Sequence, residues 1–335
     1  MQSVVRTALV DTPGNPVPDA SRCVAVTTKD GIVLRFAHWP AISGAIRGTV
    51  LLLQGRAEFI EKYFETVGHF RHRGFDVASF DWRGQGGSQR LVRNPRKGHV
   101  RRFSDYHLDL DAAFAEMAEQ PRPKPWFIVA HSMGAAILLA RLGLGPTPAA
   151  RAALSSPMIS LSAQIAPRYA GAVATTLSGL GGGRMFVPGG GSGSISAKPF
   201  EGNRLSTDFR RYQRNAAVLA AAPDLAIGDP TVDWLASACR TMRALSDPHF
   251  PRKIGTPLLI LASGADRVVS TAATERFASR LKTGEAIIIK GARHELLMES
   301  DICRNQALAA IDAFIPGGDR FQRGRPTEAF SAGSD

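Results

Sequence analysis

The stretch IVAHSMGA, residues 128–135, decides the predicted fold. An apolar run that favours a strand, WFIVAHS at 126–132, ends in Ser132, and an apolar run that favours a helix follows at once over 133–144. A serine on such a turn is lifted to the carboxyl edge of a parallel sheet, where doubly wound folds hold their ligands. The position two before the serine, usually glycine, is Ala130. Whether Ser132 is a nucleophile therefore depends on the rest of the chain.

The turn at Ser132 is tight, so the residues that flank it must be small. Gly134 lies two positions after the serine and Ala130 two before it, so the turn carries one extra methyl group. Alanine is compatible with this position if its φ angle is negative. Met133 offers its backbone N–H at the start of the helix, where free amides and the helix dipole favour an oxyanion.

Outward from this turn, short β-rich runs alternate with longer helical ones. A leading hairpin, Val24–Thr28 and Ile32–Trp39, is predicted around the turn signal Asp30-Gly31. Buried strands are predicted at 49–54, 75–82, 126–132, 258–262 and 285–290, and helices at 58–73, 105–120, 133–144, 271–282 and 301–315. The alternation predicts an α/β fold with a doubly wound, mostly parallel sheet.

The interval 158–247 breaks this alternation, because it contains no strong strand pattern. A Gly-rich segment at 179–194 precedes helical patterns at 208–222 and 234–245. The glycines fit either a disordered segment or a mobile cover over a site. We expect a helical cap inserted into one core, which divides the chain into core parts 1–157 and 248–316 and the cap 158–247, with a polar, frayed tail over 317–335.

A reactive serine needs a base, and the base needs a carboxylate that orients it. In this kind of fold the chain order is serine, acid, histidine. Asp266 follows the apolar run LLILASG, and His294, the only one of eight histidines after Asp266, follows AIIIKGA. Both are expected in loops at the edge that carries Ser132. We therefore predict Ser132 as the nucleophile, His294 as the base and Asp266 as the orienting acid.

Each of these residues also has a purely structural interpretation. Ser132 could only cap the helix, Asp266 could cap the following turn with Arg267, and His294 could be an ordinary loop histidine. The neighbouring His131 is predicted to be structural, because its side chain should leave the strand on the side opposite to Ser132. The three residues at three strand ends, in the required order, favour the catalytic interpretation.

The second oxyanion donor is expected from the loop after the third strand, QGRAE at 54–58. Gly55 allows the backbone to turn there, and the candidate donor is the Arg56 N–H. The Arg56 guanidinium fits two roles equally well, a contact with a phosphate or a surface ion pair with Glu58 or Glu61. No catalytic role is assigned to this side chain.

The formal net charge of +12 favours anionic partners, and six Lys or Arg residues lie in 90–102. A solvated surface loop, anionic lipid or a phosphate-bearing substrate all fit this run. Nucleic acid is not expected, because stacking aromatics and a binding motif are missing from the run. The glycine-rich turn 83–88 resembles a dinucleotide fingerprint, but the third glycine position is Gln89, so no cofactor is expected.

The three cysteines, Cys23, Cys239 and Cys303, are too scattered for a disulfide framework or a metal site. The first residues do not form a secretory signal, and the longest uncharged stretch, 169–183, is shorter than the roughly 20 residues of a spanning helix. We expect a cytoplasmic protein, with peripheral contact at the inner face of the membrane as an option that the charge leaves open. The oligomeric state is not predicted.

Six motifs resemble the lysophospholipase and monoacylglycerol lipase group of α/β-hydrolases, and the resemblance extends over about residues 24–315. They are LLLQGRAEFIEKY (51–63), DWRGQGGS (81–88), GHVRRFSDYHLDL (98–110), AHSMGA (130–135), GADRVV (264–269) and GARHELLMES (291–300). The segment 203–212 also resembles the cap of that group. Gln54 replaces the group's usual histidine before the glycine, and Ala130 its first elbow glycine.

The resemblance implies an α/β-hydrolase fold with a cap inserted after the sixth strand, near 152–156. It implies Ser132, Asp266 and His294 as the triad, and the amides of Arg56 and Met133 as the oxyanion hole. The expected activity is hydrolysis of the carboxylic ester of a single-acyl lipid, without cofactor or metal. The alternatives are a general carboxylesterase, an acyltransferase or a peptidase of the same fold, and a non-catalytic binding protein.

Overall fold

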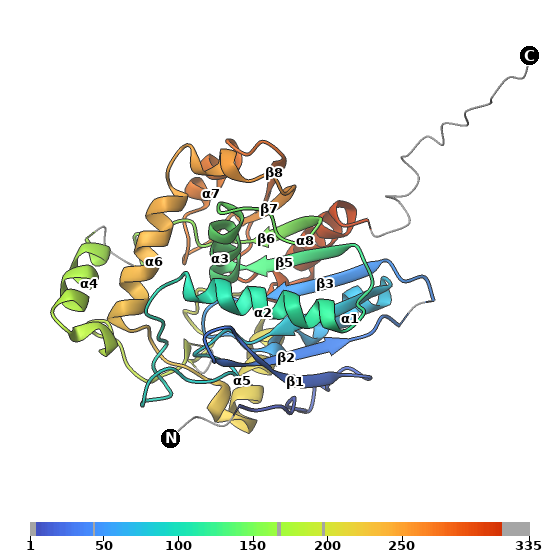
Figure 1. Cartoon of the computed structure of the whole chain (residues 1–335), viewed down its shortest axis with the longest axis horizontal. Helices are drawn as coiled ribbons and strands as arrows, with labels where there is room; N and C mark the ends of the chain where they lie inside the picture. The colour runs from blue at the N-terminus through green and yellow to red at the C-terminus, as the bar shows by residue number, and fades with distance from the viewer. Residues whose placement is uncertain (1–4, 43, 166–168, 196–197, 317–335) are drawn as a thin grey trace, which may run out of the picture.

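A computed structural model describes residues 5–316 except 43, 166–168 and 196–197; the predicted tail 317–335 lies outside the described residues. The chain forms an eight-stranded sheet in the order β1-β2-β4-β3-β5-β6-β7-β8 (Figure 1). The strands are β1 (Arg22–Thr27), β2 (Val33–Trp39), β3 (Gly48–Leu53), β4 (Phe75–Phe80), β5 (Trp126–His131), β6 (Arg151–Ser155), β7 (Leu258–Ser263) and β8 (Gly284–Ile289).

The sheet is parallel from β4 to β8, and only β2 runs antiparallel to both of its neighbours. The predicted leading hairpin is β1 and β2, which pair from Arg22 opposite His38 to Thr27 opposite Val33. The prediction of a mostly parallel α/β sheet is confirmed. The parallel strands therefore point their carboxyl ends to one edge, which is where β5 delivers Ser132.

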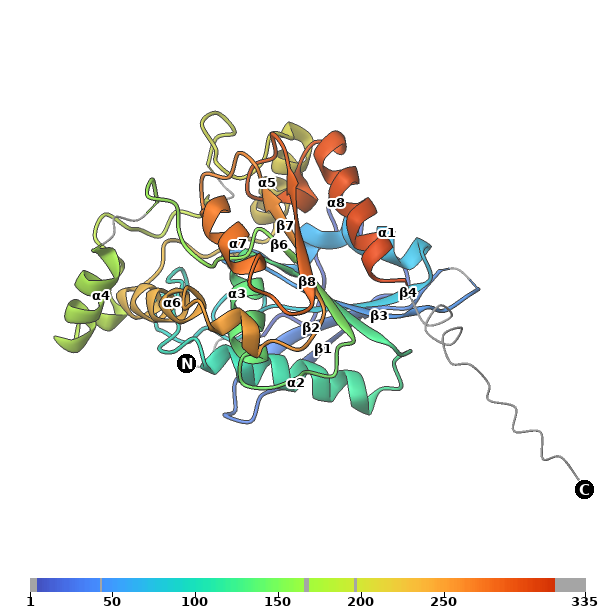
Figure 2. The ribbon, with the colours of Figure 1, turned by 90° about the horizontal axis from the view of Figure 1, so that it is seen from above.

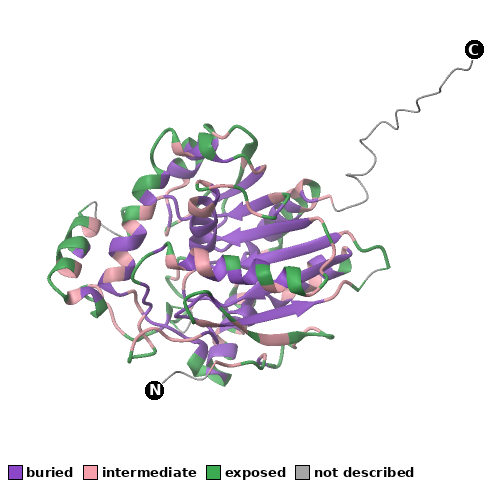
Figure 3. Ribbon diagram, viewed as in Figure 1, coloured by how far each residue is buried: buried purple, intermediate pink, exposed green. Residues whose placement is uncertain are grey.

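Helices cover both faces of the sheet, as the two sides of Figure 2 show. One face carries α2 (Asp105–Glu119), α3 (Ser132–Leu142) and α7 (Thr271–Ala278), and the other carries α1 (Phe64–His72) and α8 (Asp301–Phe314). Alternate residues of β5 serve the two cores, with Ile128 on the α3 side and Phe127 and Val129 on the α1 side. Burial on both faces explains the continuous apolar runs in the sequence, and Figure 3 shows the central strands buried.

In the described part of the chain between β6 and β7, the regular elements are helices joined by irregular segments. This segment contains α4 (Ala170–Gly179), α5 (Phe209–Ala221) and α6 (Val232–Leu245), with short 3₁₀ helices η2 (Gly182–Arg184) and η4 (Pro223–Leu225). A further 3₁₀ turn, η5 (Phe250–Lys253), also lies between β6 and β7, whereas η1 (Ile60–Tyr63) and η6 (Leu296–Met298) lie outside this segment.

Helix α4 is not among the predicted elements: its sequence AGAVATTLSG lies almost entirely before the Gly-rich segment 179–194, in a stretch for which no helix is predicted. The helix packs on α6 through Ala174, which contacts the buried Val232 and Ala236. Small residues permit this close approach, so a partner some 60 positions away decides the structure, not the local pattern. Among the described helices, none is both long and apolar enough to cross a bilayer.

Candidate active site

The sharp turn at Ser132 has its strained residue at the serine itself. Ser132 has φ +49°, whereas Ala130 keeps an ordinary negative-φ backbone and is fully buried. Gly134 is the position that excludes a side chain, because a Cβ atom there would lie 2.5 Å from the carbonyl oxygen of Gln54. Helix α3 therefore approaches the end of β3 closely, and alanine at position 130 does not disturb the turn.

The structure brings the three predicted triad residues together. The Nε2 of His294 lies 2.9 Å from the Oγ of Ser132, and its Nδ1 lies 2.8 Å from the Oδ2 of Asp266. Burial by itself raises the pKa of Asp266, but the hydrogen bond and charge of His294 and two backbone N–H groups bring the pKa below its usual value. The acid is therefore ionised at neutral pH and holds the proton of His294 on Nδ1.

Asp266 also caps the turn that follows it, as its structural interpretation suggested. Its Oδ1 accepts the N–H groups of Val268 and Val269 at 2.7 and 2.9 Å, which leaves Oδ2 for His294. The two roles are thus compatible, and the turn fixes the direction in which the carboxylate points. Ser132 does not cap α3 with its side chain, since its Oγ faces His294 instead.

The expectation that His131 points away from Ser132 is wrong. Its ring lies 4.9 Å from the ring of His294 and lines the same pocket, and its Nδ1 lies 3.2 Å from the Ser155 carbonyl oxygen. Strand alternation does not apply across the turn, because Ser132 has left the extended conformation. Burial, with the charges of His294 and Lys62, lowers the pKa of His131 to about 4 against the opposing charge of Glu58, so the ring is neutral.

A buried ionic cluster behind the two histidines was missed by the sequence analysis. Lys62 bridges Glu58 at 2.8 Å and Glu295 at 2.6 Å, and the Tyr63 hydroxyl donates to Glu58 at 2.7 Å. The two carboxylates raise the pKa of Lys62 although burial opposes them. The spacing of Glu58 and Lys62, four residues apart in a helical pattern, was a signal for one half of this cluster.

The loop predicted to supply the second oxyanion donor is held from two sides. The Gly55 N–H donates to Glu58, while Gln85 donates to the Gly55 carbonyl at 2.8 Å and accepts the Ala57 N–H at 3.2 Å. Gln85 belongs to the glycine-rich turn 83–88, which here supports this loop. Within the described part of the chain, the Arg56 N–H donates no hydrogen bond, and the Met133 N–H lies in the first turn of α3. The oxyanion hole remains a prediction.

The Arg56 side chain does not form the ion pair with Glu58 or Glu61 that the sequence left open. Glu58 is bound by Lys62, and Glu61 is bound by Arg35 at 2.7 Å. The guanidinium instead donates to the Gly228 carbonyl and lies 5.3 Å from the centre of the Trp234 ring.

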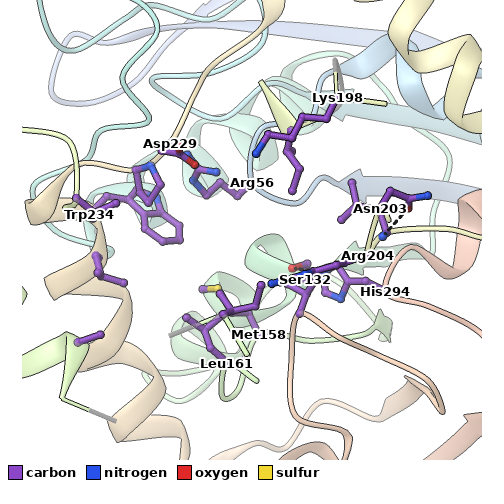
Figure 4. Close-up of a pocket in the computed structure, with 18 of the residues that line it drawn as sticks. Arg56, Ser132, Met158, Leu161, Lys198, Asn203, Arg204, Asp229, Trp234 and His294 are labelled. Atoms are coloured by element: carbon purple, nitrogen blue, oxygen red, sulfur yellow. Dashed lines mark hydrogen bonds between the residues drawn. The ribbon is translucent and has the colours of Figure 1, made fainter. Parts of the chain in front are cut away.

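A pocket of about 900 Å³ opens above Ser132 and His294 (Figure 4). Much of its wall is apolar and comes from the chain between β6 and β7, including Leu161, Val173, Leu177 and Leu235. Within the described residues, no three His, Cys, Asp or Glu side chains are placed to hold a metal ion.

The mostly parallel sheet, with a serine at a strand-to-helix turn joined to a histidine and an aspartate, defines the α/β-hydrolase class. Residues 44–301 match the family described as serine aminopeptidase, S33, and the chain belongs to this family. Lysophospholipase L2 of Escherichia coli strain K12 is 35% identical, with 88% of each chain covered, and a probable lysophospholipase L2 of Haemophilus influenzae is 29% identical, with 86% and 90% covered. The predicted resemblance to the lysophospholipase group of α/β-hydrolases is therefore confirmed.

Solved structures confirm the fold. A soluble variant of monoglyceride lipase from Saccharomyces cerevisiae, bound to a substrate analogue, superposes with a TM-score of 0.69 over 89% of this chain and 97% of that one, at 20% identity. A thermostable carboxyl esterase from Bacillus coagulans, bound to glycerol, has a TM-score of 0.68 over 89% and 99% of the two chains, at 18% identity.

Proposed function

We propose that the protein is a serine ester hydrolase that cleaves single-acyl lipids, lysophospholipid or monoacylglycerol, through an acyl-enzyme on Ser132. The observation that carries the proposal is the hydrogen-bonded chain Ser132–His294–Asp266 at the base of an apolar pocket. Relatives named lysophospholipase L2 support the substrate class over nearly the whole chain.

The mechanism follows from the geometry of the three side chains. The Nε2 of His294 takes the proton of Ser132 as the Ser132 Oγ bonds to the ester carbonyl carbon. Asp266 stabilises the resulting imidazolium through Nδ1. The amides of Arg56 and Met133 are the donors for the oxyanion. The carbon–oxygen bond to the alcohol then breaks, and Nε2 returns the proton to the leaving oxygen. Water repeats the sequence on the acyl-enzyme.

The pocket supports a single acyl chain as the substrate's apolar part. Its volume of about 900 Å³ lies within the range of small-molecule sites, and Val173 and Leu177 of α4 contribute to its apolar wall. The segment 158–247 acts as the cap in this proposal, and 1–157 and 248–316 as the two parts of the core.

The proposal includes peripheral contact with an anionic membrane from the cytoplasmic side. Large apolar side chains are exposed around α4, among them Tyr169, Leu180 and Met185, and Figure 1 shows α4 projecting from the rest of the molecule. Such side chains suit a lipid surface, and the positive net charge suits anionic head groups. The three cysteines are free thiols, as is usual in a reducing compartment.

A panel of substrates tests the proposal. We expect higher kcat/KM for long-chain lysophospholipid or monoacylglycerol than for short esters, and no cleavage of an aminoacyl anilide, which represents the activity in the family's description. Equal rates on short and long esters would favour a general carboxylesterase, and anilide cleavage a peptidase. Acyl transfer to an added alcohol at the expense of hydrolysis would favour an acyltransferase.

A fluorophosphonate probe tests catalysis separately from substrate choice. We expect one adduct, on Ser132, and loss of both adduct and esterase activity in Ser132→Ala. Ser279→Ala, at an exposed serine that follows α7, is the matched control and should keep both. A folded wild-type protein without an adduct would identify a binding protein on a hydrolase scaffold.

A further inference from the structure

The Arg56 guanidinium is a cation inside the substrate pocket without an ion-pair partner. None of the described carboxylates lies within 4 Å of it, and its Nε is buried without a hydrogen-bond partner. The contacts on its other side are the Gly228 carbonyl and the Trp234 ring. These contacts hold the guanidinium in place but leave one of its donors unused.

An enclosed guanidinium with an unused donor favours an anionic ligand. Burial lowers the pKa of Arg56 to about 10, with the charge of Asp229 opposing the shift, so the group remains protonated at neutral pH. Asp229 does not neutralise it by contact, since the pair is farther apart than 4 Å and one Asp229 oxygen accepts the Gly191 N–H at 3.0 Å. A partly buried charge of this kind is stabilised when a ligand of opposite charge supplies acceptors.

A second cation, Lys198, lies on the same side of the pocket. In Figure 4 its side chain extends into the pocket towards Arg56, on the far side of the space above Ser132. Within the described part of the chain, its ammonium group makes no ion pair. Two cations, the half-buried guanidinium of Arg56 and the exposed ammonium of Lys198, therefore line the pocket across from the nucleophile.

We propose that the Arg56 side chain, assisted by Lys198, binds the phosphate of a lysophospholipid head group. This inference rests on the proposed function and names its substrate: a lysophospholipid in preference to a monoacylglycerol. One residue then contacts both ends of the polar part of the substrate, its backbone N–H at the ester carbonyl and its guanidinium at the phosphate.

The lengths of the two molecules match. About five covalent bonds separate Cα from Cζ in arginine, and about six separate the carbonyl carbon from phosphorus in a 1-acyl lysophospholipid, so the spans are similar. A monoacylglycerol has no anion for this position and leaves the Arg56 guanidinium without a counter-ion. Sites built to bind a charged group discriminate strongly against ligands that lack it.

The test compares two substrates with the same acyl chain, 1-oleoyl lysophosphatidylcholine and 1-oleoylglycerol, in micelles of one neutral detergent. Arg56→Gln keeps the backbone N–H but removes the charge, so we expect the ratio of kcat/KM for lysophospholipid to that for monoacylglycerol to fall about 10- to 100-fold. Lys198→Gln should lower the ratio in the same direction by a smaller factor. General damage to the loop would lower both rates and leave the ratio unchanged.

Arg101→Gln is the matched control, because Arg101 is exposed in the basic run 90–102 and loses the same charge. The ratio of kcat/KM values for Arg101→Gln should equal that of the wild type.

A second measurement uses sn-glycerol 3-phosphate as a competitive inhibitor of short-ester hydrolysis. Its inhibition constant should rise at least tenfold in Arg56→Gln. If that variant is inactive, binding of the same probe by Ser132→Ala, with and without Arg56→Gln, is compared by calorimetry.

The inference is overturned if Arg56→Gln changes neither the ratio nor binding of the phosphate probe, if Arg101→Gln produces the same fall, or if the wild type favours monoacylglycerol. Failure of the proposed function looks different, because the wild type would then prefer neither long-chain lipid over a short ester.

Discussion

At the scale of single residues, the turn at Ser132 shows which position needs glycine. The sequence raised the question at Ala130, but the strain falls on Ser132 and the steric limit on Gly134. Smallness was the right criterion, and the pattern could not tell which of the two flanking positions is the stricter one. The answer depends on the carbonyl of Gln54, which belongs to another strand end.

Substitutions at the two flanking positions should behave oppositely. Ala130→Gly should keep kcat within about twofold and cost roughly 0.5–1 kcal/mol of stability, because glycine loses more entropy on folding. Gly134→Ala should lower both stability and kcat, the latter by at least about tenfold, since its methyl displaces the loop that carries the predicted oxyanion donor. Kinetics on a short ester and thermal unfolding check both.

Gly68→Ala is the control for a glycine replaced in open space. Nothing lies within 4 Å of a Cβ atom at Gly68, in the middle of α1, so alanine should raise stability by up to about 1 kcal/mol and leave kcat unchanged. Wild-type activity and stability in Gly134→Ala would contradict the steric explanation.

His131 should make stability depend on pH. Its pKa in the folded protein, about 4, lies below the ordinary 6.5, so the unfolded chain takes up this proton first. The stabilisation is complete above pH 6.5 and is lost as the pH falls from 6.5 towards 4, with a slope of up to about 1.4 kcal/mol per pH unit. Urea unfolding between pH 4.5 and 7 should show a shallower slope for His131→Asn.

The comparison uses slopes, because His131→Asn also changes packing at every pH. His249→Asn, at an exposed histidine after α6, is the matched control and should retain the wild-type slope. Equal slopes for wild type and His131→Asn would mean that the ring does not resist protonation.

At the scale of helices and strands, long apolar runs were predicted well and short or small-residue segments were not. The core strands β3, β4, β5 and β7 follow their predicted ranges to within a few residues, because burial on both faces gives each of them a continuous apolar run. Strand β8 also follows its predicted range, but the prediction that it is buried is wrong, since it lies at the sheet edge and most of its residues are exposed. Strand β6, RAALS, is too short and small to stand out, and it was expected only from the family resemblance. Helix α4 depends on packing against α6.

The triad was predictable, but of the ionic cluster beside it only the Glu58–Lys62 half was. Chain order and strand ends determine the positions of Ser132, Asp266 and His294, so the fold itself brings them together. The partners of Lys62 and Arg56 instead depend on where separate loops meet, for example at Glu295 and Gly228. The spacing of residues along the chain carries no information about such contacts between distant loops.

Glu65 of α1 should anchor helix α5 of the proposed cap. Its carboxylate accepts from Arg211 at 2.7 and 2.9 Å and from Arg214 at 2.8 Å. Although burial opposes the shift, these arginines and Arg304 lower the pKa of Glu65 to about 2 from 4.5, so the contact stabilises the fold above pH 4.5 and is lost as the pH falls towards 2.

Glu65→Gln should therefore loosen α5 selectively at neutral pH. We expect faster amide exchange over 209–221, by a factor of about five or more, with no change in α2. Glu119→Gln, at an exposed glutamate that ends α2, is the matched control and should leave exchange in α5 unchanged. Unaltered exchange in Glu65→Gln would show that apolar packing alone holds the helix.

At the scale of the whole molecule, the parallel sheet separates two ends with different surfaces. Ser132 starts α3 at the carboxyl edge, and α3 runs back so that Leu144 follows its end at the opposite edge. Leu180 follows α4, which lies on the side of the pocket. The two leucines are similarly exposed, at 79% for Leu180 and 75% for Leu144, so they form a natural pair for testing which end meets a membrane.

The proposed membrane contact predicts that a negative charge introduced at the pocket end weakens vesicle binding, whereas the same charge at the opposite end does not. Leu180→Asp should weaken sedimentation with vesicles of phosphatidylglycerol and phosphatidylcholine by several-fold, whereas Leu144→Asp should bind like the wild type, with equal unfolding midpoints for all three. Binding by the wild type should also fall when salt is raised from 0.1 to about 0.5 M, because screening weakens attraction between the +12 chain and anionic lipid. Equal losses in both variants would assign the binding to net charge alone, since each substitution removes one unit of it. A loss of binding confined to Leu180→Asp would mean that the end of the molecule with the Ser132 pocket contacts the membrane. A lipid could then pass from the bilayer into the pocket without crossing water.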